Sequence, residues 1–135
     1  MATVQEIRDG IETRLATIAG LRCADHVPEH VAPPIAVIAY QGTDFHVASG
    51  NGLTIQRFFV DLLVGRQDSR TSQAAVHEYV ENTGTKSVRA AIEADRTLGL
   101  TNTDAVVDSV DMAGFEEVAG TTWLGVRFSI RVHTR

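Results

Sequence analysis

The residues best suited to metal binding in this sequence are its five histidines. His26 and His30 lie four residues apart, a spacing that suits two metal ligands on one face of a helix, but Pro28 between them disfavours a helix there. No HExxH or CxxC motif and no carboxylate at ligand spacing accompanies this pair. The other histidines have no partner that the sequence identifies. We therefore expect ordinary loop or surface histidines and no metal site.

Nucleophilic or acid–base catalysis would fall to Cys23 or to acidic residues. Cys23 is the only cysteine, so the chain has no internal disulfide, and we expect a small apolar residue in a short strand rather than a nucleophile. Five acidic residues gather late in the chain and include candidates for an acid–base pair: Asp104, Asp108, Asp111, Glu116 and Glu117. We expect them at solvated or interface-facing positions of an edge strand, where charge opposes slipped pairing. The GxxxxGK, GxGxxG and GxSxG motifs are absent, so the sequence predicts no catalytic residues, no cofactor and no enzyme.

Length and charge limit the remaining classes of protein. The chain has 135 residues, of which 44% are hydrophobic, enough for one domain with a core of its own. Its 12 basic and 17 acidic residues give a net charge of −5, which disfavours wrapping of a nucleic-acid backbone. No stretch approaches the roughly 20 apolar residues of a membrane helix, and the opening MATVQEIRDG lacks an export-signal pattern. We expect a protein without membrane association that folds in reducing cytoplasm.

The first part of the chain predicts a helix followed by short strands. Apolar residues recur every three or four positions over residues 4–19, Thr3 and Glu6 form a capping-box pattern at the start, and Gly20 ends the helix. Residues 21–24 are expected to be extended, and the apolar run 35–40 to be a strand covered on both faces. Residues 41–52 contain three glycines and no clear period, so we expect a long hairpin loop with its tightest turn at Asn51–Gly52.

The rest of the chain predicts two helices between long strands. Alternation over residues 53–65 places Phe58, Val60, Leu62 and Val64 on one face of a strand. Helices are expected at 71–82 and from Ser87, with a break at Gly84, and residues 105–117 and 121–133 form a hairpin that turns near Gly120. The prediction is a single α+β domain over residues 1–135, with one mostly antiparallel or mixed sheet of four or five strands and helices packed on one face.

Polar residues that alternate outward on the two longest strands make the candidate site. The last strand turns Arg127, Ser129, Arg131 and a solvated His133 away from its apolar row, and the earlier strand adds Arg57 and Asp61. A solvated sheet face explains this mixture, and contact with neighbouring subunits is the alternative. Phe45 and Val47 in a polar, glycine-rich loop favour the alternative, since a solvated loop has little reason to carry them. The candidate interface residues are Asp44, Phe45, His46, Val47, Arg57, Asp61, Arg127 and Arg131.

Three segments carry a resemblance to a known family. The opening stretch GIETRLATIAGLRCADHVPEHVAPPIAVI, the middle stretch SVRAAIEADRTLGL and the closing stretch GTTWLGVRFSIRVHT together resemble tail terminator proteins of siphophages that infect actinobacteria. The matched residues are packing and turn signatures rather than catalytic ones. One departure is GLT at residues 99–101, where the family tends towards paired glycines.

The resemblance implies a homo-oligomeric ring, expected to be a hexamer, at the neck end of the tail in the virion. Such a ring binds the last ring of tail tube protein, stops polymerisation and presents a docking face to the head–tail connector. DNA passes through its opening without sequence-specific binding, and assembly takes place in the host cytoplasm. The alternatives are a head–tail joining or tail completion protein of the neck and, from a different class, a small ligand-binding module or enzyme.

Overall fold

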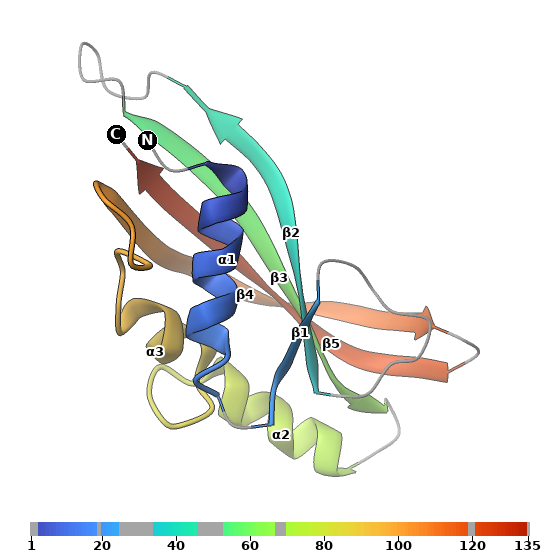
Figure 1. Ribbon diagram of the computed structural model, residues 1–135. Coiled ribbons are helices and arrows are strands. Elements are labelled where there is room, and N and C mark those ends of the chain that lie inside the picture. The colour runs from blue at the N-terminus through green and yellow to red at the C-terminus, as the bar shows by residue number, and fades with distance from the viewer. Residues whose placement is uncertain are drawn as a thin grey trace.

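The computed structural model describes residues 3–18, 20–24, 34–45, 53–66, 70–118 and 121–134 (Figure 1). One mixed five-stranded sheet carries its helices on one face, so the predicted α+β class is confirmed. The strand order is β1-β2-β3-β5-β4, with β1 parallel to β2 and every other pair antiparallel. The elements are α1 (Val4–Leu15), β1 (Arg22–Ala24), β2 (Ile35–Asp44), β3 (Thr54–Arg66), α2 (Arg70–Val80), α3 (Val88–Glu93), β4 (Thr103–Val118) and β5 (Thr121–Thr134).

The beginning of α1 forms as its sequence predicts. The Glu6 backbone N–H donates to Thr3 Oγ1 at 3.1 Å, and the Thr3 N–H donates to Glu6 Oε1 at 3.3 Å, which completes the capping box. The helix ends at Leu15, earlier than the predicted residue 19, and a tighter turn through Ile18 leads to Gly20. Gly20 has φ +81°, the left-handed conformation that glycine adopts most readily.

The predicted loop over residues 41–52 is wrong for its first four residues, because β2 continues to Asp44. A bulge between Tyr40 and Gly42 shifts the pairing with β3, and this interrupts the alternation by which a strand is recognised. Residues 46–52, with the predicted Asn51–Gly52 turn, lie outside the described residues. Residues 35–38 are all buried, as expected of a strand covered on both faces.

The helices pack on the alternating apolar row of the sheet. Phe58, Val60 and Leu62 of β3 and Phe128 and Ile130 of β5 are each at most 1% exposed. They belong to one core cluster with apolar residues of all three helices. The predicted facing of both long strands is therefore confirmed.

The second half of the chain matches its prediction with small shifts in the bounds. α2 covers most of the predicted segment 71–82, and Ser87 caps α3 by accepting a hydrogen bond from the Ala90 N–H at 3.1 Å. Gly84, at the predicted break, has φ +116°. β4 begins at Thr103, two residues before the predicted position, and the turn near Gly120 lies outside the described residues.

One close contact between α1 and the segment after α3 was not apparent from the sequence. A Cβ at Gly10 would lie 2.8 Å from Leu98 Cβ and 3.1 Å from the Leu98 carbonyl oxygen. Leu98 is buried and has φ +53°, a conformation that side chains other than glycine seldom adopt. Gly10 therefore allows the backbone of α1 to approach this turn.

Candidate functional site

The face of the sheet turned away from the helices, called here the open face, holds most of the predicted interface residues. Its rows are fixed by the strand register rather than by sequence separation. Asp61 of β3 lies opposite Arg127 of β5, and Arg127 lies opposite Asp111 of β4. Arg57 lies opposite Arg131 in a second row. The structure therefore brings together residues that are far apart in the sequence, such as Arg57 and Arg131.

The centre of the open face is a two-point ion pair. Arg127 Nε lies 2.7 Å from Asp61 Oδ1, and Arg127 Nη2 lies 3.1 Å from Asp61 Oδ2. This parallel arrangement is the strongest geometry that arginine and a carboxylate form. The guanidinium also lies 4.6 Å from the centre of the Phe59 ring, which adds a cation–π contact. Because the Asp61 side chain is only 19% exposed, this pair is held more rigidly than a pair in open solvent.

Two further arginines are each paired with a carboxylate on a flanking strand. Arg57 and Arg131 are direct cross-strand neighbours, and like charges in that position repel. Arg57 Nε lies 3.4 Å from Asp44 Oδ2 on β2, and Arg131 Nη2 lies 3.1 Å from Asp108 Oδ1 on β4. A Cβ at Gly42 would lie 2.8 Å from Arg57 Nη2, so the guanidinium occupies the space that this glycine leaves.

Phe45 directly follows Asp44, the last residue of β2, in the sequence. Its side chain is 68% exposed, the largest exposed fraction among the described large hydrophobic residues. His46 and Val47, predicted with it, lie outside the described residues. Aromatic residues are enriched at protein contact sites, which makes Phe45 a candidate for contact and no more than that on its own.

The arrangement favours contact with protein over contact with phosphate. Among the described side chains, Arg57, Arg127 and Arg131, which the open face presents from β3 and β5, each have a carboxylate partner within 3.4 Å. A basic groove would instead leave its cations free to replace the counterions of a nucleic-acid backbone. The part of the open face formed by these three ion pairs is thus polar and neutralised.

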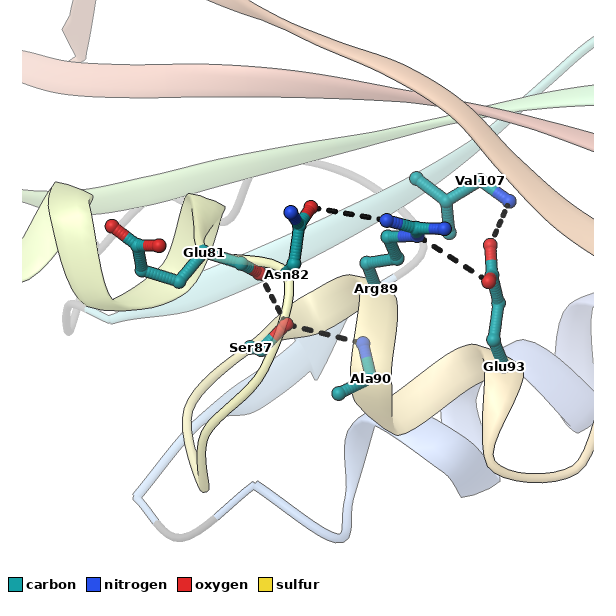
Figure 2. Close-up of polar contacts among 7 residues, drawn as sticks. All are labelled: Glu81, Asn82, Ser87, Arg89, Ala90, Glu93 and Val107. Atoms are coloured by element: carbon teal, nitrogen blue, oxygen red, sulfur yellow. Dashed lines mark hydrogen bonds and ion pairs between the residues drawn. The ribbon is translucent and has the colours of Figure 1, made fainter.

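A second polar cluster, at the junction of α2, α3 and β4, was missed by the sequence analysis (Figure 2). Glu93 Oε1 accepts from Arg89 Nε at 3.3 Å, while Glu93 Oε2 accepts from the backbone N–H of Val107 at 3.0 Å. Arg89 Nη1 also donates to Asn82 Oδ1 at 3.0 Å, and Ser87 Oγ donates to the Glu81 carbonyl. The spacing of Arg89 and Glu93 is a recognisable helical pair, but nothing in the sequence shows that Glu93 reaches a strand.

A pocket of about 300 Å³ lies beside this junction. Its lining comes from both the helices and the edge strand: Val80, Asn82, Arg89, Val107, Asp108, Ser109, Val110 and Phe128. Arg89 and Asp108, its charged residues, are each held by an ion pair, to Glu93 and Arg131. The pocket therefore offers mixed lining rather than a convergent set of reactive groups.

Among the described residues, the titratable candidates do not gather into a reactive site. Burial, with a smaller contribution from Glu12, raises the pKa of Cys23 to about 11, so its thiol is protonated at neutral pH. In the described part of the chain, no three histidine, cysteine or acidic residues are placed to hold a metal ion. His26 and His30 lie outside that part.

The expectation that His133 is solvated is wrong. The residue is half-buried, and its Nδ1 is buried without a hydrogen-bond partner among the described residues. It borders a pocket of about 530 Å³ together with Leu53, Asn102, Thr103 and Asp104. β3 and β4 flank β5 at this point, and His133 lies opposite Ile55 and Asp104, so the ring has a neighbouring residue on each side that its own strand does not reveal.

Comparison with known proteins gives no relative on which to base an assignment: no protein-family model matches the chain, and no curated protein is significantly similar to it. Among the described residues, no helix combines the length and the apolar character needed to cross a membrane.

Proposed function

We propose that this chain is a structural protein of a bacteriophage tail, a tail terminator. Copies assemble as a ring, expected to be a hexamer, on the neck end of the tail tube. The ring stops polymerisation of the tube protein and offers a docking surface to the head–tail connector. DNA passes through the ring without sequence-specific binding, in keeping with the net charge of −5.

The observation that carries this proposal is the open face. A sheet covered by helices on one side exposes three ordered ion pairs on the other, and the exposed Phe45 directly follows β2. Paired charges on a rigid sheet give specificity in protein contacts, because a partner must present groups in a matching arrangement. The resemblance of three segments to tail terminators supports the particular assignment, and the fold has the layers that this resemblance implies.

The direct test is a tube-length assay. Tail tube protein of the same phage is polymerised with and without the purified chain, and tube lengths are measured by negative-stain electron microscopy. We expect shorter tubes, each with added density at one end. Unchanged tube lengths would refute the terminator assignment, and binding to DNA-filled heads instead of tubes would indicate the neck protein alternative.

A further inference from the structure

The sheet has two outer strands, β1 and β4, and each leaves part of its backbone unpaired. The Arg22 N–H donates to the Pro34 carbonyl at 3.3 Å, so Arg22 turns its backbone groups towards β2. Alternate residues of a strand bond to opposite sides. The N–H and C=O of Cys23 therefore point away from β2, and they have no partner among the described residues.

The outer edge of β4 is covered along its first half only. The Ala105 N–H donates to the Arg96 carbonyl at 2.7 Å, and the Val107 N–H donates to the Glu93 carboxylate. The outward N–H groups of both residues are therefore satisfied. A bulge after Val107 then shifts the outward set by one residue, to Val110 and Met112. Beyond the bulge, residues 109–111 are exposed, and no backbone hydrogen bond to their outer side is found among the described residues. The described residues Asn82 and Arg89 face Ser109 and Val110 across the pocket of about 300 Å³. Figure 1 shows the far ends of β4 and β5 extending past the helices.

The two unpaired edges lie in the same rows of the sheet. Counting across the register, the row of Cys23 ends at Met112, and the row of Ala24 ends at Asp111. The row of Ala24 runs Ala24, Val37, Asp61, Arg127, Asp111. A neighbouring copy placed beside the first in the plane of the sheet, without any shift along the strands, thus brings β1 next to the open half of β4.

Direction and charge agree with this placement. β1 runs parallel to β2, and three antiparallel steps lead from β2 to β4, so β1 and β4 run in opposite directions and would pair as antiparallel strands. Arg22 and Asp111 are both exposed, and neither has an ion-pair partner in the described part of the chain. In the paired arrangement they lie on the same face two rows apart, a diagonal separation of about 7–8 Å that a long side chain spans.

The charge of β4 also disfavours the simplest competing arrangement, in which two copies of β4 pair with each other. The strand carries five acidic residues and no lysine or arginine, so its formal charge of −5 equals the net charge of the whole chain. Two copies of β4 side by side would therefore repel one another. A strand with an unpaired arginine is the complementary partner.

We infer that β1 of one copy adds to the outer edge of β4 of the next, so that the sheet continues across subunits with Ala24 opposite Asp111 and Arg22 diagonal to Asp111. This inference rests on the proposed function for the ring. Because the two edges differ, the contact is heterologous, and repetition of a heterologous contact closes into a ring or extends as a chain rather than stopping at a dimer.

Disulfide trapping tests the geometry. Ala24 and Asp111 are expected to lie directly opposite in a pair without hydrogen bonds between them, where Cα atoms are about 4.5 Å apart and a disulfide can form. Ala24→Cys and Asp111→Cys are combined in a Cys23→Ala background and oxidised, alone and with tail tubes. We expect a ladder of covalent oligomers up to the size of the ring. A mixture of the two single-cysteine chains should give dimers only, and absence of the ladder in both conditions would overturn the inference.

Charge exchange tests the complementarity. Arg22→Asp or Asp111→Arg alone should reduce ring formation at least tenfold by titration in sedimentation velocity, and the double exchange should restore it. The matched control reverses the surface pair Lys86 and Glu78, which are 3.5 Å apart and belong to neither edge strand, and should leave ring formation unchanged. Single exchanges without effect, or a double exchange without rescue, would contradict the contact.

The two proposals fail in distinguishable ways. If the chain shortens tail tubes but gives no ladder, the interface is wrong and the terminator assignment stands. If the ladder forms in solution but tubes keep their length, the interface stands and the assignment is wrong.

Discussion

The two faces of the sheet use the same strands for different purposes. The covered face is apolar from Phe58 to Val64 in β3 and from Leu124 to Val132 in β5, beneath three helices, whereas the open face holds ion pairs and a cation–π contact. Burial of the first face provides the main stabilisation of the fold, at roughly 25 cal/mol per Å² of apolar surface. The second face contributes little to stability because partly exposed ion pairs are weak. A strand can therefore keep one face for folding and leave the other free to specify contacts.

The strongest test of this difference is a charge on the covered face. Phe128 is 1% exposed, so Phe128→Asp removes a large apolar side chain and buries an unpaired carboxylate. We expect a loss of at least about 4 kcal/mol and an unfolded chain by circular dichroism. Ser129→Asp, at the next residue and on the open face, is the matched control and should remain folded. If Phe128→Asp gave the spectrum and melting of the native protein, the assignment of the two faces would be wrong.

Gly10→Ala sharpens the comparison from the helix side. Alanine favours a helix over glycine by up to about 1 kcal/mol, so an exposed site would gain stability. At Gly10 the new Cβ would lie 2.8 Å from Leu98 Cβ and 3.1 Å from a backbone oxygen, so overpacking dominates. We expect a net loss of about 1–3 kcal/mol in urea denaturation. In a Leu98→Gly background, the additional loss caused by Gly10→Ala should be smaller than in the native chain. A stabilised Gly10→Ala chain would show that the contact is looser than described.

The open face should respond weakly by comparison. Asp61→Asn keeps the size of the side chain but removes the charge that holds Arg127 through two contacts of 2.7 and 3.1 Å. We expect a loss of about 1 kcal/mol in the free energy of unfolding, because the arginine remains partly solvated. Asp44→Asn, whose partner Arg57 is 3.4 Å away with both side chains well exposed, should cost under about 0.5 kcal/mol. Equal effects of the two substitutions would argue against a special role for the Asp61 pair.

The sequence predicted the covered face better than the open one for a physical reason. Alternation within one strand is a local property, and it correctly placed Phe58 and Phe128 inside. Which residue lies across from which depends on register, and register follows from packing between distant segments. Alternation indicated that Arg127 and Asp61 point outward, but only the fold shows that they form a pair. Glu93, which caps an outward N–H of β4, could not be found at all from its local pattern.

The edges of the sheet were the hardest part to predict. Bulges in β2 and β4 each add a residue that breaks the two-residue period, so residues 41–44 resembled a loop. The acidic residues of β4 were correctly expected on an edge strand. Arg96 and Glu93 already accept hydrogen bonds from part of this edge. Their positions depend on how the chain returns from the helices to the sheet, and no sequence period indicates this.

The smallest effect on stability, and the largest on assembly, is expected at Phe45. With 68% of its side chain exposed, Phe45→Ser removes little buried surface, and the free energy of unfolding should change by under about 0.5 kcal/mol. If the open face and Phe45 contact the tail tube, the same change should abolish the shortening of tubes, because an exposed aromatic ring gains its burial only on contact. Thr13→Ser on the exposed side of α1 is a control that should alter neither measurement. If the Phe45→Ser chain shortened tubes with the potency of the wild-type chain, Phe45 would not belong to the contact surface. That surface would then be confined to the ion pairs of β3 and β5.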